Sequence, residues 1–269
     1  MIVFPNCKIN LGLNIISRRE DGYHDLETVF LPIPFTDVLE IISSDKTELA
    51  VTGLPVNAND NLCSRAYYLL QKDFPDLPPV KMHLHKVIPL GAGLGGGSSD
   101  AAFTLQLLNE KFKLNLKTEE LIDYALQLGS DCPFFIINKP CFATGRGEIL
   151  QPINIDLNNY KFLIVNPGIH IDTKWAFSKV IPQERKVSIK DIITQPIESW
   201  KDQLHNDFES AVFAVYPEIK KIKNDLYDQG AVYASLSGSG SSVFGIFSKE
   251  ENIQYTGNAK YFNKVINFN

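Results

Sequence analysis

The sequence is sparing with cysteine and offers no cysteine pattern typical of a metal or redox site. Its 269 residues contain four cysteines, Cys7, Cys63, Cys132 and Cys141, and none of them forms a C-x-x-C pair. This spacing argues against a zinc ribbon and against a thioredoxin-like site. We expect reduced, partly buried thiols in a cytoplasmic protein.

Long hydrophobic runs are also missing. The longest apolar runs, such as residues 134–137, fall far short of the roughly 20 residues that a membrane-spanning helix needs. The first ten residues, MIVFPNCKIN, contain no basic segment followed by a long apolar stretch and are not rich in Arg or Ser. We therefore expect no signal peptide, no transit peptide and no membrane partner.

An excess of positive charge is absent as well. The chain carries 26 Lys and Arg residues against 31 Asp and Glu residues, which gives a formal net charge of −5. This balance argues against nucleic acid as a partner. The hydrophobic content of 44% and the charged content of 21% are ordinary for a globular enzyme with one large domain or two smaller ones.

The periodicity of the chain predicts an α+β protein without regular βαβ units. Residues 5–15 alternate apolar and polar, which predicts a strand with one buried face and with Lys8 and Asn10 on the same side. Further strands are predicted at 38–42, 49–52, 80–85, 161–165, 231–236 and 242–247. Helices are predicted at 61–70, around 101–112, from 118 to a stop at Gly129, from about 131, and over 207–229. We place a domain boundary between residues 155 and 156, which gives domains 1–155 and 156–269.

The stretch PLGAGLGGGSSDAA, residues 89–102, concentrates five glycines and two serines directly before an apolar helical pattern. A dinucleotide site would need a strand running into this loop and a strand after the next helix. Here Pro89 interrupts the strand, and a second helix is predicted to follow the first. No Gly-Lys-Ser/Thr, H-R-D or D-F-G pattern is present, which argues against a P-loop and a protein kinase.

The loop therefore favours a phosphate-binding role, in which backbone N–H groups and a helix N-terminus hold an anion. Ser98 or Ser99 is the predicted N-cap. The alternative is a glycine-rich turn with capping serines and no ligand.

This loop resembles the phosphate-binding motif of the GHMP kinase superfamily, which includes galactokinase, homoserine kinase and mevalonate kinase. Four further stretches, in the family order, resemble the branch that phosphorylates the 2-hydroxyl of 4-diphosphocytidyl-2-C-methyl-D-erythritol in the non-mevalonate isoprenoid pathway. They are KINL at 8–11, REDGYHDL at 19–26, GSDCPF at 129–134 and LSGSGS at 236–241. Two details depart from the commoner form: Cys7 replaces an alanine, and SGSGSS lacks the usual threonine and alanine after its glycines.

The resemblance implies a two-domain α+β kinase fold with its active site in the cleft between the domains. It implies ATP with Mg²⁺ bound to phosphate and water, and the sequence offers no set of metal-binding side chains. We expect a monomer or weak homodimer. Asp131 matches the catalytic base, and Lys8 matches the lysine beside it that would keep it ionised. The implied ATP-binding residues are Pro89, Gly91, Ala92, Gly93, Leu94, Gly95, Gly96, Gly97, Ser98 and Ser99 for the phosphates, and Asn61 and Lys86 for the adenosine. The implied substrate-binding residues are Asn10, Tyr23, His24, Thr173 and Phe177.

Each of these residues also has a structural alternative. Lys8 alone suits an exposed strand lysine, Asp131 and Asn61 suit helix caps, and Lys86 suits a surface lysine. The Asp-Gly-Tyr-His stretch suits a hairpin turn. The rival functions are another GHMP kinase, a non-catalytic nucleotide sensor and a dinucleotide-dependent oxidoreductase.

Overall fold

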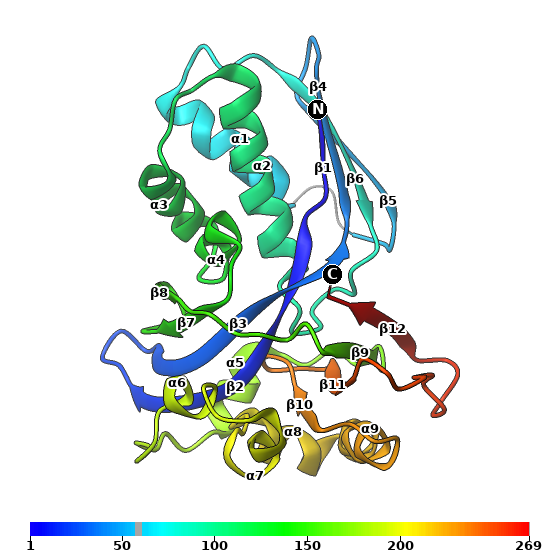
Figure 1. Cartoon of the computed structure of the whole chain (residues 1–269). Helices are drawn as coiled ribbons and strands as arrows, with labels where there is room; N and C mark the ends of the chain where they lie inside the picture. The colour runs from blue at the N-terminus through cyan, green and yellow to red at the C-terminus, as the bar shows by residue number, and fades with distance from the viewer. Residues whose placement is uncertain (57–60, 269) are drawn as a thin grey trace. The chain divides into compact units, whose positions relative to one another are not determined.

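The computed structural model describes residues 1–56 and 61–268 of the chain, and these form two compact units (Figure 1). The units alternate along the sequence. The first unit comprises Met1–Cys7, Phe35–Leu90 and Gly95–Lys139. The second unit comprises Lys8–Pro34, Gly91–Leu94 and the chain from Pro140 onward. The domain boundary between residues 155 and 156 stays a prediction.

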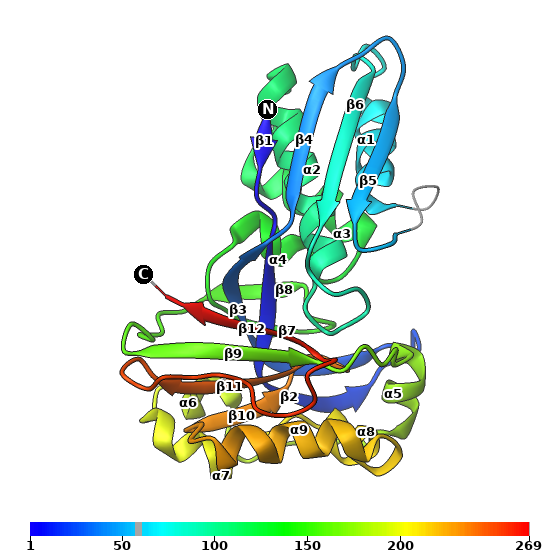
Figure 2. The same ribbon diagram turned by 90° about the vertical axis from the view of Figure 1, so that its right-hand side faces the viewer.

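The first unit is a four-stranded sheet with helices on one face. Its strand order is β1 (Ile2–Val3), β4 (Val38–Ser43), β6 (Val80–Lys86) and β5 (Glu48–Gly53). Neighbours are antiparallel except β5 and β6, which are parallel. The helices are α1 (Leu62–Asp73), α2 (Gly96–Phe112), α3 (Thr118–Leu128) and α4 (Cys132–Ile137). Helices α1 and α2 pack against each other and against the sheet, as Figure 2 shows.

The second unit contains an antiparallel sheet covered by helices. Its strand order is β10 (Tyr233–Leu236), β11 (Val243–Ser248), β9 (Tyr160–Asn166) and β12 (Phe262–Asn267). The helices are α5 (Thr173–Lys179), α6 (Ile189–Ile192), the 3₁₀ turn η1 (Ile197–Ser199), α7 (Trp200–Gln203), α8 (Phe208–Val215) and α9 (Pro217–Asp228). Helix α9 packs on β10 and β11 (Figure 2). The core between them buries Ile222, Leu226 and Val243.

A third sheet contains the two longest strands of the described chain. Its order is β2 (Asn6–Arg18), β3 (His24–Thr36), β7 (Cys141–Thr144) and β8 (Ile149–Pro152). The turn between β2 and β3 is closed by hydrogen bonds from the Arg19 N–H to the Tyr23 carbonyl (2.8 Å) and from the Gly22 N–H to the Arg19 carbonyl (3.2 Å). This confirms the Asp-Gly turn.

Most predicted elements are confirmed, and the helix–helix order after the glycine loop is among them. Because α3 and not a strand follows α2, the dinucleotide-binding interpretation is excluded. The predicted helix over 207–229 is interrupted, since α8 ends before Pro217 and α9 begins there. In the described residues, no helix is both long and apolar enough to cross a membrane.

The prediction that β2 has only one buried face is wrong. Every residue from Asn6 to Ile15 is buried, the polar ones included. Polar side chains buried in this way must find hydrogen-bond partners. The second face of β2 therefore carries the buried polar residues Asn6, Lys8, Asn10 and Asn14.

Candidate active site

Lys8 projects from β2 into a buried polar row in the second unit. Its side chain is only 3% exposed, and its ammonium donates to Asn10 Oδ1 at 2.7 Å. Asn10 Nδ2 in turn donates to Thr28 Oγ1 on β3 at 2.9 Å. The row confirms that Lys8 and Asn10 share one side of the strand, and it rules out the exposed lysine. A buried, oriented ammonium of this kind can stabilise negative charge.

The first half of the glycine loop, Gly91–Leu94, lies against the loop Ser237–Ser242, which we call the serine–glycine loop. Ser237 Oγ donates to the Gly93 carbonyl at 2.9 Å, and the Ser242 N–H donates to the Ala92 carbonyl at 3.1 Å. Gly93 has a φ of +77°, and a Cβ there would lie 1.9 Å from the Ser237 carbonyl oxygen. Only glycine permits this approach.

The second half of the loop starts helix α2. Gly95 is the N-cap in a left-handed conformation (φ +68°), with no side chain capping the helix and no acidic residue in its first turn. The prediction of Ser98 or Ser99 as N-cap is wrong, because the helix already begins at Gly96. The first N–H groups of a helix lack partners within it and carry the positive end of its dipole. This arrangement suits a phosphate.

Ser98 and Ser99 lie in the first turn of α2 and have different surroundings. Ser98 lies close enough to Cys132, the first residue of α4, to lower the pKa of its thiol. Burial raises the pKa of that thiol to about 12, so Cys132 is a structural group and not a nucleophile. The Ser99 hydroxyl is buried, and none of the residues that the structure describes forms a hydrogen bond with it.

Asp131 stands at the N-cap position of α4, next to the residue that Ser98 contacts. Its backbone is helical (φ −83°, ψ −16°), and its side chain makes no capping hydrogen bond to the helix. Asp131 therefore occupies the N-cap position, as the capping alternative had it, but its side chain does not cap the helix. The Ser98–Cys132 contact places the first turn of α2 beside the start of α4, within the first unit. A carboxylate at this place can act as a base near a bound phosphate.

Lys86 is neither on the surface nor unpaired. Its side chain is 1% exposed, and its ammonium contacts the carboxylates of Asp37 and Asp100, the latter at 2.8 Å. Burial acts to lower the pKa of Lys86, but the two carboxylates outweigh it and raise that pKa. Burial raises the pKa of Asp100 to about 7, against the opposing effect of Lys86.

This buried group lies against the second half of the glycine loop. A Cβ on Gly96 would lie 3.1 Å from Lys86 Nζ and 2.9 Å from Ile88 Cγ2. A glycine at this position leaves room for the start of α2 to pack closely against the Lys86 ammonium and Ile88. Asp37 also accepts hydrogen bonds from the N–H groups of Val87 (2.6 Å) and Ile88 (2.9 Å), which ties the end of β6 to the same cluster.

Asn61 and Lys86, the two residues expected near the adenosine, both make structural contacts within the protein. Asn61 Oδ1 accepts the Cys63 N–H at 2.9 Å and caps α1, so the helix-cap alternative for Asn61 is confirmed. Lys86 is occupied by its two carboxylates. Adenosine contacts from either residue remain a prediction.

The residues expected to hold the cytidine lie in the second unit. Tyr23 is 54% exposed at the β2–β3 turn, and its N–H donates to Asp21 Oδ1 at 3.0 Å. The rings of His24 and Phe177 stack, with centroids 5.0 Å apart and planes 20° apart. Phe177 is supported edge-on by Phe208 at 4.9 Å. Two adjacent aromatic surfaces are thus fixed by the strand and by α5.

His24 is suited to recognising a polar ring edge. Partial burial lowers its pKa, and the charge of Arg18 lowers it further. The imidazole is therefore neutral at neutral pH, with one nitrogen donating and the other accepting. A nucleobase edge presents the same mixture of donors and acceptors.

Thr173 begins α5 and lies beside the serine–glycine loop. Its hydroxyl is 3.3 Å from Ser239 Oγ, while Asp172 caps the helix through the Trp175 N–H at 2.6 Å. The serine–glycine loop thus meets both the glycine loop and a residue expected to bind substrate.

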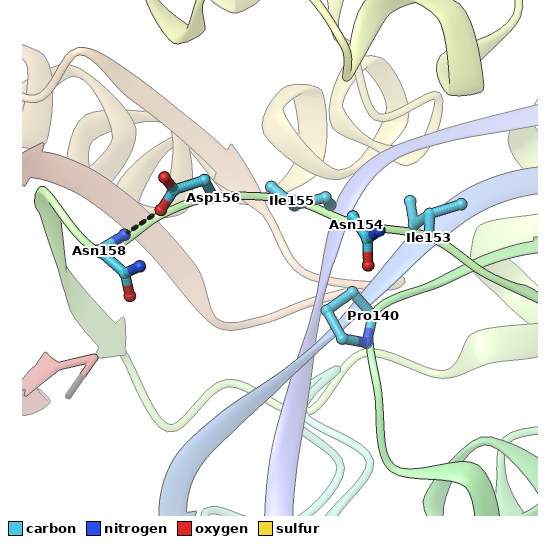
Figure 3. Close-up of a pocket in the computed structure, with 6 residues that line it drawn as sticks. All are labelled: Pro140, Ile153, Asn154, Ile155, Asp156 and Asn158. Carbon is cyan, nitrogen blue, oxygen red and sulfur yellow. Dashed lines mark hydrogen bonds between the residues drawn. The ribbon is translucent and has the colours of Figure 1, made fainter.

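The structure contains two surface pockets whose lining residues include none of the predicted site residues. The first, of about 320 Å³, is drawn in Figure 3 and is lined by Pro140, Ile153, Asn154, Ile155, Asp156 and Asn158. Its one carboxylate, Asp156, accepts the Asn158 N–H at 3.0 Å. The second, of about 220 Å³, lies along α9. Across the described residues, no three His, Cys, Asp or Glu side chains are grouped to hold a metal ion.

Several contributors to these sites carried no assignment from sequence. Thr28 and Asp37 had no local signal, because each acts through a partner distant in the chain. Asp100 directly follows the two serines of the loop, and its position there was the available clue.

Comparison with known proteins places the chain in a family. Residues 61–139 match the GHMP kinases N terminal domain, and residues 188–261 match the GHMP kinases C terminal domain. A 4-diphosphocytidyl-2-C-methyl-D-erythritol kinase of Azobacteroides pseudotrichonymphae is 53% identical over 93% of this chain and 94% of its own length. A protein of that name from Bacteroides fragilis is 53% identical over 94% of each chain.

Solved structures agree with this placement. The crystal structure of a 4-(cytidine 5′-diphospho)-2C-methyl-D-erythritol kinase matches with a TM-score of 0.79 and 31% identity, over 91% of this chain and 89% of that one. The mevalonate kinase of Methanococcus jannaschii matches with a TM-score of 0.69 and 17% identity, over 100% and 98% of the two chains, which is a likeness of fold. The chain thus belongs to the GHMP kinases, and within them to the family of 4-diphosphocytidyl-2-C-methyl-D-erythritol kinases.

Proposed function

We propose that the protein transfers the γ-phosphoryl group of ATP to the 2-hydroxyl of 4-diphosphocytidyl-2-C-methyl-D-erythritol, giving the 2-phosphate and ADP. This is a step of the non-mevalonate route to isoprenoid precursors. Phosphoryl transfer needs alignment of the reactants, neutralisation of charge and removal of the hydroxyl proton. The residues described above supply groups for each of these needs.

The ATP phosphates are proposed to bind at the glycine loop and the start of α2. The support is the run of left-handed glycines at 91, 93 and 95 and the uncapped helix end that follows them. Ser98 and Ser99 are proposed as hydroxyl donors. Mg²⁺ is proposed to arrive with the nucleotide, held by phosphate oxygens and water, and to neutralise charge on the phosphates.

Asp131 is proposed as the base that takes the proton from the 2-hydroxyl. The support is a carboxylate that does not cap its own helix, next to the residue that contacts the phosphate loop. Lys8 is proposed as the fixed cation of the reaction, since its ammonium is buried and oriented by Asn10. Both roles are electrostatic and need no covalent intermediate.

The observation that carries the substrate assignment is the aromatic group of Tyr23, His24 and Phe177. Tyr23 is proposed to stack on the cytosine, and the neutral His24 to address its polar edge. Asn10 and Thr173 are proposed to line the rest of the substrate. Mevalonate, homoserine and galactose carry no base, so a kinase acting on them would have no use for this group.

Replacing Tyr23 tests this assignment. In Tyr23→Ala, the KM for the cytidine substrate should rise about 5- to 150-fold, because the lost stacking of one base is worth about 1–3 kcal/mol. The KM for ATP should not change. Steady-state kinetics with each substrate varied in turn would measure both values.

Two control variants sharpen this test. Tyr23→Phe keeps the ring and should keep a KM near that of the unaltered protein. Tyr68→Ala removes a tyrosine of similar exposure, 51%, on α1 and should have no effect. A KM unchanged in Tyr23→Ala would mean that the base binds elsewhere.

We also propose a reducing compartment for the protein, because all four cysteines are buried and free. The acidic balance of the chain argues against a nucleic-acid partner. For the oligomeric state, a monomer or weak homodimer is proposed.

A further inference from the structure

Arg146, to which the proposed function gives no role, lies over the ring of Tyr23. Its guanidinium carbon is 4.8 Å from the ring centroid, which is a cation–π distance. The Arg146 side chain is 28% exposed, whereas Tyr23 is 54% exposed. The arginine therefore covers one face of the ring, and the tyrosine still has much of its surface open.

The turn that carries Arg146 is fixed by its own hydrogen bonds. It joins β7 to β8, with Gly145 and Gly147 at φ values of +68° and +107°. The Arg146 N–H donates to Glu148 Oε2 at 2.6 Å, and the Gly147 N–H donates to the Thr144 carbonyl at 3.1 Å. The position of the Arg146 backbone is thus set by the turn itself.

The same turn is joined to the strand that carries His24. The Leu26 N–H donates to the Gly145 carbonyl at 2.7 Å, two residues beyond His24 on β3. The Arg146 guanidinium also lies near Glu148, with Nε 3.6 Å from Oε1. The Arg146 guanidinium therefore contacts two groups: the Glu148 carboxylate and the ring of Tyr23.

Tyr23 has its backbone anchored and its ring left to be oriented by packing. Its N–H is bound by Asp21, which is itself paired with Arg19 at 3.1 Å. These contacts fix the position of the Tyr23 backbone but leave the rotation of its ring unrestrained. A planar guanidinium over the ring restricts that rotation, and the flexible ammonium of lysine would do so poorly.

We infer that Arg146 is a positioning residue for the nucleobase of the substrate. It occupies one face of the Tyr23 ring and fixes its orientation, so that the cytosine stacks on the opposite face. The inference rests on the proposed function. It adds a specificity element from the β7–β8 turn, which acts through Tyr23.

The test measures binding of cytidine 5′-diphosphate to the full chain by isothermal titration calorimetry. Arg146→Ala is expected to weaken binding about two- to fivefold, the equivalent of about 0.5–1 kcal/mol for an exposed cation–π contact. Arg146→Lys should resemble Arg146→Ala, because it keeps the charge and loses the plane. In the Tyr23→Ala background, Arg146→Ala should have no further effect.

Kinetics and a matched control separate positioning from general damage. Arg146→Ala should raise the KM for the cytidine substrate by the same factor, with kcat and the KM for ATP unchanged. Lys201→Ala removes another cation–π contact of the second unit, 4.7 Å from the Tyr227 ring centroid, and should leave cytidine 5′-diphosphate binding unaltered.

Three results would overturn the inference: binding unchanged in Arg146→Ala, full rescue by lysine, or an equal loss in the Tyr23→Ala background. Each of these leaves the proposed function intact if the unaltered protein binds cytidine 5′-diphosphate and turns over. If the unaltered protein binds no cytidine nucleotide and has no turnover, both the proposed function and the inference fail.

Discussion

Asp131→Asn is expected to reduce kcat by about 10²- to 10⁴-fold, the usual contribution of a positioned general base. The amide matches the carboxylate in size but cannot accept the hydroxyl proton. The side chain of Asp131 does not cap α4, so the start of this helix should survive the substitution. Affinity for ATP should therefore stay nearly unchanged.

The experiment combines single-turnover kinetics with equilibrium binding of ATP. Asp123→Asn, at an exposed position on the neighbouring helix α3, is the matched control and should behave as the unaltered protein. Turnover of Asp131→Asn at the unaltered rate would remove Asp131 from the mechanism. A parallel loss of ATP binding would instead indicate damage to the phosphate loop.

Gly93→Ala is expected to lower kcat/KM for ATP by more than about tenfold. The added Cβ would lie 1.9 Å from the Ser237 carbonyl oxygen, and the residue would be held at φ +77°. The left-handed conformation alone costs a non-glycine residue about 1–2 kcal/mol. The clash must additionally push the serine–glycine loop away from the glycine loop.

Gly168→Ala separates the clash from the backbone strain. Gly168 has nearly the same φ, +75°, but nothing lies within 4 Å of the position of its Cβ. The Gly168→Ala variant should lose some thermal stability and keep its activity. The Gly93→Ala variant should lose more activity than its loss of stability explains. Equal kinetics for the two variants would show that the contact between the two loops is not needed for catalysis.

Elements with strong local signals were predictable from the sequence. Helix α3 has acidic residues in its first turn and Gly129 at its end, and it lies where the pattern placed it. The strands β4 and β9 are short, mostly apolar runs, and β6 alternates apolar and polar residues. All three lie as predicted. In each case the information sits within a few residues.

Elements that depend on distant partners were not predictable. Strand β3 contains Pro32 and Pro34, which disfavour a strand when read locally. It forms because β2 and β7 flank it in the sheet. The burial of both faces of β2 has the same kind of origin, since no pattern within the strand reports what packs on its polar side.

The candidate site divides in the same way. The glycine loop could be interpreted from composition, whereas Lys8, Asp131 and Tyr23 took their roles from the family resemblance. Lys86 shows the limit of local reasoning, because its partner Asp37 is 49 residues away. The contact of Arg146 with Tyr23 likewise joins two turns far apart in the chain.

The most direct measurement is ADP release by the purified protein with Mg²⁺ and ATP, in the presence of 4-diphosphocytidyl-2-C-methyl-D-erythritol, mevalonate, homoserine or galactose. We expect release with the cytidine compound alone, and a product carrying one added phosphate at its 2-hydroxyl. Release with one of the other alcohols would keep the GHMP kinase chemistry and contradict the cytidine assignment. ATP binding without turnover of any of the four compounds would contradict the assignment as a kinase and favour a non-catalytic nucleotide sensor.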